Sequence, residues 1–310
     1  MTPYLLIALI IVASAVIGIF YKSHTEIESA KSDAPLMMFF AMAPLAIISL
    51  IICLFDKFEM GPSVILTGLA CSVFMLSAMT FLLKSMKSGS FTISIIIINL
   101  NFCVPIVLSH LFLNEKVSLF QLFGILLLVG VIIYTNLKGG NSEEATKQEN
   151  TGSKRFLFYA VMACLSNGMS NFMIKLQQYY TPGKGENSFY LVMYGGAALI
   201  CAVAFLITRY LHKPKDNTPM NTEMSAVGMK KELRLLLIGL GMGLCLAGCQ
   251  YPQSFLPGYL NAPVQFTLIA AGAVLLSIAI GFVKYREKPN ATNIISSICC
   301  ILAIFLQLLN

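Results

Sequence analysis

The sequence predicts an all-α, polytopic membrane protein with ten transmembrane helices arranged as two inverted five-helix repeats. Its composition, ten apolar runs and segments that recur in both halves lead to this prediction. Of the 310 residues, 57% are hydrophobic and 11% are charged, and the mean hydropathy is +0.79. An ordinary soluble domain carries about 25% charged residues. The composition therefore excludes a soluble enzyme, a nucleic-acid-binding module and a disordered chain, and membrane lipids are the expected surroundings.

Ten apolar runs are close in length to the roughly 20 residues that cross a bilayer as a helix. Hydrocarbon admits only helices and closed barrels, and these runs lack the alternation of polar and apolar residues that barrel strands show. The runs are Tyr4–Tyr21, Pro35–Phe55, Val64–Leu83, Phe91–Leu113, Leu119–Leu137, Phe156–Ile174, Phe189–Tyr210, Leu233–Cys249, Val264–Val283 and Ile294–Leu309.

The first run is expected to remain as a helix of the mature protein. No basic segment precedes Tyr4, and the residues around Lys22 make a poor cleavage site for a signal peptide.

The fourth run contains Pro105, which removes a backbone hydrogen bond and should kink the helix. Two amides, Asn99 and Asn101, precede it at membrane depth. Polar groups there are expensive in lipid, so both should face the interior of the bundle. Because they are about 200° apart on a helix, we expect one to join helices and the other to reach a cavity.

The sixth run carries polar residues at i, i+3, i+4 and i+8, namely Asn167, Ser170, Asn171 and Lys175. This spacing predicts one polar face. On a transmembrane helix such a face indicates a water-lined cavity or a bundle interior. Lys175 lies near the outer end of the run, so we expect it to extend toward the membrane interface rather than to bind an anion.

In the eighth run, Gly239, Gly243 and Ala247 recur every four residues. Small residues at this spacing let another helix approach closely, so we expect this face to be a packing face. The glycines do not form a nucleotide loop, because no strand precedes them. No metal-ligand cluster is apparent either, and no cofactor is predicted.

A polar stretch, 139–155, divides the chain nearly in half and is predicted to be a cytoplasmic linker. The first repeat then covers 1–138 and the second covers 156–310. Of the 21 Lys and Arg residues, 17 fall in the loops after odd-numbered helices. The positive-inside rule places those loops in the cytoplasm. We therefore predict an integral protein of the cell membrane with both termini outside.

Segments of the first half recur in the second at offsets between 153 and 172 residues. Glu115 falls over Glu287 at an offset of 172, and Gly68–Ser72 falls over Gly239–Gly243 at 171. At an offset of 153, three residues at the end of the first helix match three at the end of the sixth: Ser14, Gly18 and Lys22 over Asn167, Asn171 and Lys175. Because five is odd, the copies would cross the membrane in opposite senses. Inverted repeats are typical of secondary transporters, whose substrate binds near the midplane between the repeats.

The chain resembles the drug/metabolite transporter superfamily in its ten-helix form with two EamA-type domains. The resemblance is carried by Pro105 through Leu113-Asn114-Glu115-Lys116, by Gln121, Gly124 and Gly130, and by Asn261-Ala262-Pro263-Val264 leading to Glu287. The second copy departs from the pattern at Ser296 and Leu302, where the first has glycine. Glu115 and Glu287 resemble the helix-boundary glutamate of that family, which we interpret as a marker of the fold.

The resemblance implies that helices one, three, four, six, eight and nine line the substrate path. Gln250, at the end of the eighth run, is then a cavity candidate, with capping of the helix end an equal alternative. The ninth run opens with two further candidates. The predicted substrate-binding residues are Asn99, Asn101, Asn167, Ser170, Asn171, Gln250, Gln265 and Thr267.

All fourteen acidic residues lie in loops or at helix ends. The small four-helix relatives use a membrane-embedded glutamate for proton exchange, whereas the first helix here offers Ser14. His110 lies close to Glu115 and is expected to be structural. Simple proton antiport through a buried acid is therefore disfavoured, and facilitated diffusion, exchange or another coupling is left open.

The leading hypothesis is a secondary transporter that moves a small polar or amphiphilic metabolite by alternating access. Neutral amides favour substrates recognised by hydrogen bonds, such as zwitterions, sugars and nucleosides. The alternative is a flippase for lipids or lipid-linked sugars, or an accessory subunit of a membrane enzyme. An enzyme is not predicted, because no paired acids or nucleophile-with-base arrangement appears. The expected partners are the substrate and lipids, not nucleic acid; a homo-oligomer is left open.

Overall fold

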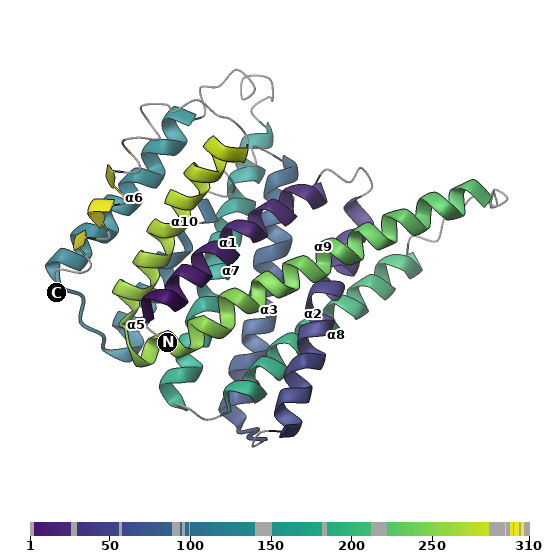
Figure 1. Ribbon diagram of the computed structural model, residues 1–310, viewed down its shortest axis with the longest axis horizontal. Helices are drawn as coiled ribbons and strands as arrows, with labels where there is room; N and C mark the ends of the chain where they lie inside the picture. Colours follow the sequence, from purple (N-terminus) through teal and green to yellow (C-terminus); the bar gives the residue numbers. More distant parts are fainter. Residues whose placement is uncertain are drawn as a thin grey trace.

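The computed structural model of the protein is a bundle of helices (Figure 1). It describes residues 3–25, 30–55, 58–88, 100–139, 151–181, 185–211 and 222–284, together with single residues or short pieces between 94 and 98 and between 295 and 306. All regular elements of these described residues are helical.

The helices follow the predicted runs and extend most of them by a few residues. Their bounds are α1 (Pro3–Thr25), α2 (Ala30–Phe55), α3 (Pro62–Ser88), the 3-10 turn η1 (Leu100–Phe102), α5 (Cys103–Leu113), α6 (Leu119–Gly139), α7 (Thr151–Tyr180), α8 (Glu186–Leu211), α9 (Thr222–Phe255), the 3-10 turn η3 (Leu256–Gly258) and α10 (Ala262–Lys284).

Six of these helices, α1, α2, α3, α7, α8 and α9, are long and apolar enough to cross a membrane. Leucines on their outer faces are largely exposed, and Leu66 and Leu199 reach 72% and 70%. Such a surface suits lipid and not water. The predicted all-α, polytopic membrane class is confirmed. Ten crossings and the inverted repeat stay predictions, because half of the tenth run lies outside the described residues.

The predicted fourth helix is interrupted rather than kinked in its interior. A 3-10 turn, η1, ends at Phe102, and α5 begins at the next residue. Pro105 is the third residue of α5. In the first turn of a helix the missing N–H has no intrahelical partner to lose, so proline is tolerated there. Pro105 therefore lies at a helix start instead of within a bent helix.

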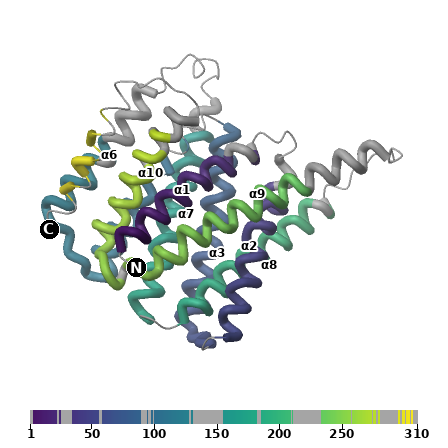
Figure 2. Tube along the Cα trace, in the orientation of Figure 1, coloured from purple at the N-terminus to yellow at the C-terminus, as the bar shows by residue number. Residues whose placement is uncertain are grey.

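Helices from the two halves of the chain pack against each other. The described contacts pair α2 with α8, α3 with both α7 and α8, and α1 and α2 with α9. In Figure 2 the purple α1 runs beside the green α9 and the yellow-green α10. The core where α2, α3, α8 and α9 meet is rich in methionine, with Met37, Met42, Met193 and Met242 fully buried.

Two glycines of α9 bring its backbone against α2. A methyl group added at Gly239 would lie 2.8 Å from the carbonyl oxygen of Met37, and one added at Gly243 would collide with that of Ala41. The prediction that this glycine face is a packing face is confirmed. Such close approach lets helices associate without a hydrophobic driving force between them.

The same arrangement recurs between α3 and α8. A methyl group added at Gly68 would lie 3.3 Å from the carbonyl oxygen of Phe189, and the Ser72 hydroxyl donates to the carbonyl of Met193 at 2.6 Å. Gly68 and Ser72 precede Gly239 and Gly243 by 171 positions, and the partners Met37 and Ala41 precede Phe189 and Met193 by 152. Both contacts therefore use positions that the predicted repeat pairs with each other.

We predict that Gly239→Ala destabilises the protein by about 1–3 kcal/mol, because overpacking forces neighbouring backbones apart. The added methyl would lie 2.7 Å from the Cβ atom of Phe40, closer than such atoms normally approach. The measurement is the midpoint of thermal unfolding in detergent. The matched control is Gly195→Ala in α8, whose added methyl meets no described atom within 4 Å. Equal midpoints for the two variants would contradict the close α2–α9 packing.

Candidate functional site

Helix α7 packs against α3 along one of its faces. The Ser170 hydroxyl lies 3.3 Å from the Cys71 sulfur, and the Thr67 hydroxyl donates to the Gln177 side-chain oxygen at 2.7 Å. Ser170 and Gln177 are both buried. They are seven residues apart and so share a face. This face of α7 therefore serves to join the two helices.

A second face of α7 packs against η1 and α5. A methyl group added at Gly168 would lie 2.7 Å from the carbonyl oxygen of Asn101, so that only glycine lets η1 approach this closely. One turn further on, the rings of Phe172 and Phe112 lie 6.2 Å apart. Because Gly168 is followed by Phe172 at i+4, these contacts form one continuous face.

Asn167 and Asn171 lie between these two packed faces. At about 100° per residue, they fall on the side of α7 between Ser170 and Gly168. Both are half-buried, as is Asn101 in η1. Within the described part of the chain, none of these three amide side chains has a hydrogen-bond partner. The structure thus brings together three predicted residues whose polar groups are unpaired.

Gln265 of α10 also lies between two packed faces of its helix, as the asparagines of α7 do. Val264 and Leu268 pack against α1 on one side, and Phe266 packs against η1 and α5 on the other. Gln265 lies between these faces and is fully buried. Its Nε2 donates to the carbonyl oxygen of Gln253 at 3.4 Å.

That contact fixes how the amide of Gln265 is turned. A carbonyl only accepts, so the nitrogen must face Gln253 and the oxygen must point elsewhere. The Oε1 atom is buried without a partner among the described residues. Thr267 is also buried and its hydroxyl unpartnered in the same part of the chain. About 200° of rotation separates it from Gln265, so the two do not share a site.

Gln250 uses its polar atoms to join helices. Its side-chain oxygen accepts from the Tyr194 hydroxyl at 2.8 Å, and its backbone carbonyl accepts from Tyr190 at 2.6 Å. Its Nε2 lies 3.3 Å from the sulfur of Met75 in α3. Gln250 and Ser170 were both predicted to bind substrate, but their side-chain polar groups contact other residues of the protein. Asn99 lies outside the described residues.

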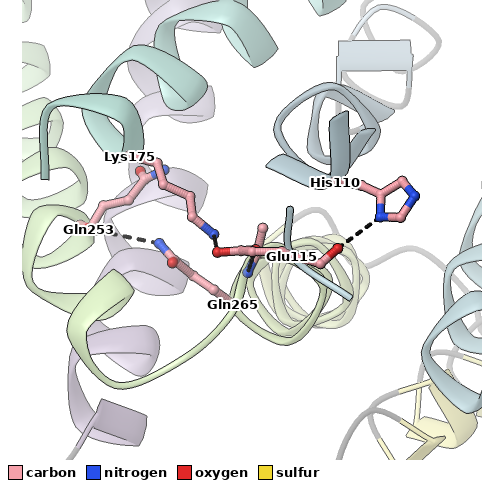
Figure 3. Close-up of polar contacts among 6 residues, drawn as sticks. His110, Glu115, Lys175, Gln253 and Gln265 are labelled. Carbon is pink, nitrogen blue, oxygen red and sulfur yellow. Dashed lines mark hydrogen bonds and ion pairs between the residues drawn. The ribbon is translucent and has the colours of Figure 1, made fainter. Parts of the chain in front are cut away.

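Sequence reasoning missed a cluster of polar contacts at the start of α10 (Figure 3). The Nζ atom of Lys175 lies 2.6 Å from Oε1 of Glu115. Oε2 of the same carboxylate accepts the backbone N–H of Ala262 at 2.9 Å. A carboxylate at a helix N-terminus satisfies an orphan N–H and suits the helix dipole. We call these three residues the latch.

The chain turns sharply to place Glu115. Asn114, the C-cap of α5, has φ +52°, a left-handed conformation that asparagine tolerates better than most residues. Nδ1 of His110 lies 2.8 Å from the carbonyl oxygen of Glu115, so the predicted structural role of this histidine is supported by a direct contact. The turn directs the carboxylate toward α7 and α10.

The expectation that Lys175 extends to the membrane interface is wrong. Its side chain is only 3% exposed, and that of Glu115 is 22% exposed. A buried ammonium needs a partner, and the carboxylate from the α5–α6 corner provides one. The predicted repeat contained a signal for this pair, since Lys175 and Glu115 each align with a residue of the same type, Lys22 and Glu287, in the other half.

Comparison with known proteins finds a family model that matches part of the chain and a solved structure with a similar fold. Residues 1–137 match the model of the EamA-like transporter family. A solved structure described as "Crystal structure of protein" superposes with a TM-score of 0.67 at 13% sequence identity, covering 98% of this chain and 96% of its own. At that identity the likeness shows the fold alone. No curated protein matches the chain.

We predict that Glu115→Gln destabilises the protein by about 3–5 kcal/mol, because it leaves the ammonium of Lys175 buried without a counter-charge. The measurement is the midpoint of thermal unfolding in detergent. The double variant E115Q/K175M removes both charges and should recover most of the loss. Lys116→Gln is the matched control, since this exposed neighbour should change stability by less than about 0.5 kcal/mol. A double variant as unstable as E115Q would contradict the ion pair as the cause.

Proposed function

We propose that the chain is an EamA-type secondary transporter that moves a small polar or amphiphilic metabolite across the cell membrane by alternating access. The family match over 1–137 supports this proposal, since it ends one residue before the predicted end of the first repeat. The fold likeness spans both halves, so it supports the proposed fold over the whole chain and not the function. The distribution of Lys and Arg favours an orientation with both termini outside.

The proposal of two inverted five-helix repeats is supported by the contacts between the halves. Under the predicted repeat, α1, α2 and α3 correspond to α7, α8 and α9. The contact of α3 with α7 should then have a counterpart in a contact of α9 with α1, and both contacts are present. In the same way, the contact of α3 with α8 has a counterpart in the contact of α9 with α2. Two halves related in this way give two packings of similar energy, one open to each side of the membrane.

The unpaired amides of Asn101, Asn167 and Asn171 are the observation on which the proposed substrate site depends. Polar groups inside a membrane bundle are expensive unless they find partners, and those that persist without one point to function. They lie where η1 meets α7, and η1 also contacts α10, which carries Gln265. A substrate held between these elements would satisfy their hydrogen-bonding groups.

The neutral character of these residues indicates the substrate class. Each amide offers both donors and an acceptor, whereas the free Oε1 of Gln265 offers an acceptor alone. Such a site suits hydroxyl, amine and amide groups. We therefore propose a zwitterion, a sugar or a nucleoside as the substrate, and not a strongly cationic drug.

Transport by purified protein in liposomes tests the proposed function. Radiolabelled amino acids, sugars and nucleosides would be offered to proteoliposomes and to protein-free liposomes. We expect protein-dependent entry of at least one class. Entry of none of the three would refute the proposed function.

We predict that Asn171→Ala lowers transport at sub-saturating substrate by about two- to twelvefold, because it removes one hydrogen bond worth roughly 0.5–1.5 kcal/mol. The measurement is the initial rate of entry into proteoliposomes. Ser166→Ala serves as the control, because Ser166 is buried and lies one turn before Ser170, which places it on the α7 face that packs against α3. Its rate should stay within about twofold of the unchanged protein. Similar losses for both variants would mean that Asn171 acts through the packing of α7 and not through the substrate.

A further inference from the structure

We propose that the latch, formed by Glu115, Lys175 and Ala262, holds the two halves together on one side of the transport path and must release when that side opens. The inference rests on the proposed alternating-access function. It concerns a contact outside the amide cluster, and it assigns to Glu115 a conformational role in place of a purely structural one.

The latch joins the halves through a single side chain. Glu115 belongs to the first half, at the corner between α5 and α6, whereas Lys175 and Ala262 belong to the second. Both oxygens of the carboxylate are engaged, one by an ammonium and one by the N-terminus of α10. Withdrawal of Glu115 would therefore break two charge-assisted contacts at once. One is an ion pair with the buried ammonium of Lys175, and the other is a charge-assisted hydrogen bond, a stronger kind than one between neutral groups.

The exposure of the two partners shows how release can occur. The Lys175 side chain is 3% exposed and the Glu115 side chain 22%, so the carboxylate is the partner that solvent reaches. A carboxylate that moves outward gains hydration, while a buried ammonium left behind needs another partner. Release of the ion pair therefore requires a second acceptor within reach of the Lys175 ammonium.

Lys175 has an acceptor one turn away on its own helix. Asn171 precedes it by four residues, and helical side chains lean toward the N-terminus of their helix, so that i and i−4 side chains meet. The amide of Asn171 has no partner within the described residues. A released ammonium can therefore turn toward Asn171, which belongs to the proposed substrate site. Opening of the latch would in this way change the charge beside the substrate.

Thiol accessibility tests the latch without any knowledge of the substrate. An Asn171→Cys variant reports access to the interior, and it is reconstituted with and without the latch change E115Q/K175M. The double change removes both charges and leaves no unpaired buried charge to unfold the protein. A membrane-impermeant maleimide is then applied separately from each side of the membrane. Labelling of the native cysteines alone provides the background.

A separate Lys116→Cys variant marks the face on which the latch lies, because Lys116 is exposed and adjacent to Glu115. We expect the latch change to speed labelling of the cysteine at 171 by about tenfold or more from the face that labels the cysteine at 116, and not from the other. A tenfold shift corresponds to about 1.4 kcal/mol between open and closed states. The control change Lys116→Gln, without the latch change, should leave the rate unaltered.

An unchanged rate at 171 would overturn the latch, and so would an equal increase from both faces, which would indicate general loosening. If E115Q/K175M does not fold, the single change Lys175→Met gives the same test, since Glu115 then retains only the N–H of Ala262. The outcome is independent of the transport assay. Altered labelling with no transport would support the latch and refute the proposed function, whereas transport with unaltered labelling would do the reverse.

Discussion

A polar group that leaves water for the interior of a membrane protein must find a partner within the protein. This constraint sorts the polar residues of the bundle into two kinds. Ser170 and Gln250 are engaged by side chains of neighbouring helices, and they join those helices. Asn167 and Asn171 are half-buried and are not engaged in this way, although packed faces lie on both sides of them. The second kind is retained at an energetic cost, and binding of a polar ligand is the simplest physical reason for that cost.

Close approach of helix backbones fixes the positions of the helices, and these positions decide which polar side chains find a partner. Lipid is as apolar as a leucine side chain, so association of helices depends on packing and on a few hydrogen bonds. Gly239 lets α9 meet α2, and Gly68 lets α3 meet α8. Gly168 does the same for η1 against α7, which brings Asn101 beside the amides of α7. The small residues thus position the proposed site without taking part in it.

Sequence predicts the helices well and their neighbours poorly, for a physical reason. Hydrophobic length follows from bilayer thickness, so the runs of α1 to α3 and α7 to α9 were visible without coordinates. The glycine face of α9 could also be predicted, because small residues every four positions let another helix approach closely. The roles of Ser170 and Lys175 depend on which helix lies opposite. Ser170 was predicted to line a cavity but meets Cys71, and Lys175 was predicted to reach the interface but meets Glu115.

The strength of the latch must suit the cycle that it would control. A transporter needs two states that differ by only a few kcal/mol, since a ligand can shift an equilibrium only by its differential affinity. A fully buried ion pair is too costly to break, and a fully exposed one contributes too little to hold a side closed. Glu115 and Lys175 lie between these limits, because one partner is buried and the other is reached by solvent. A pair of this kind can close one side of the bundle and still yield to a neutral substrate.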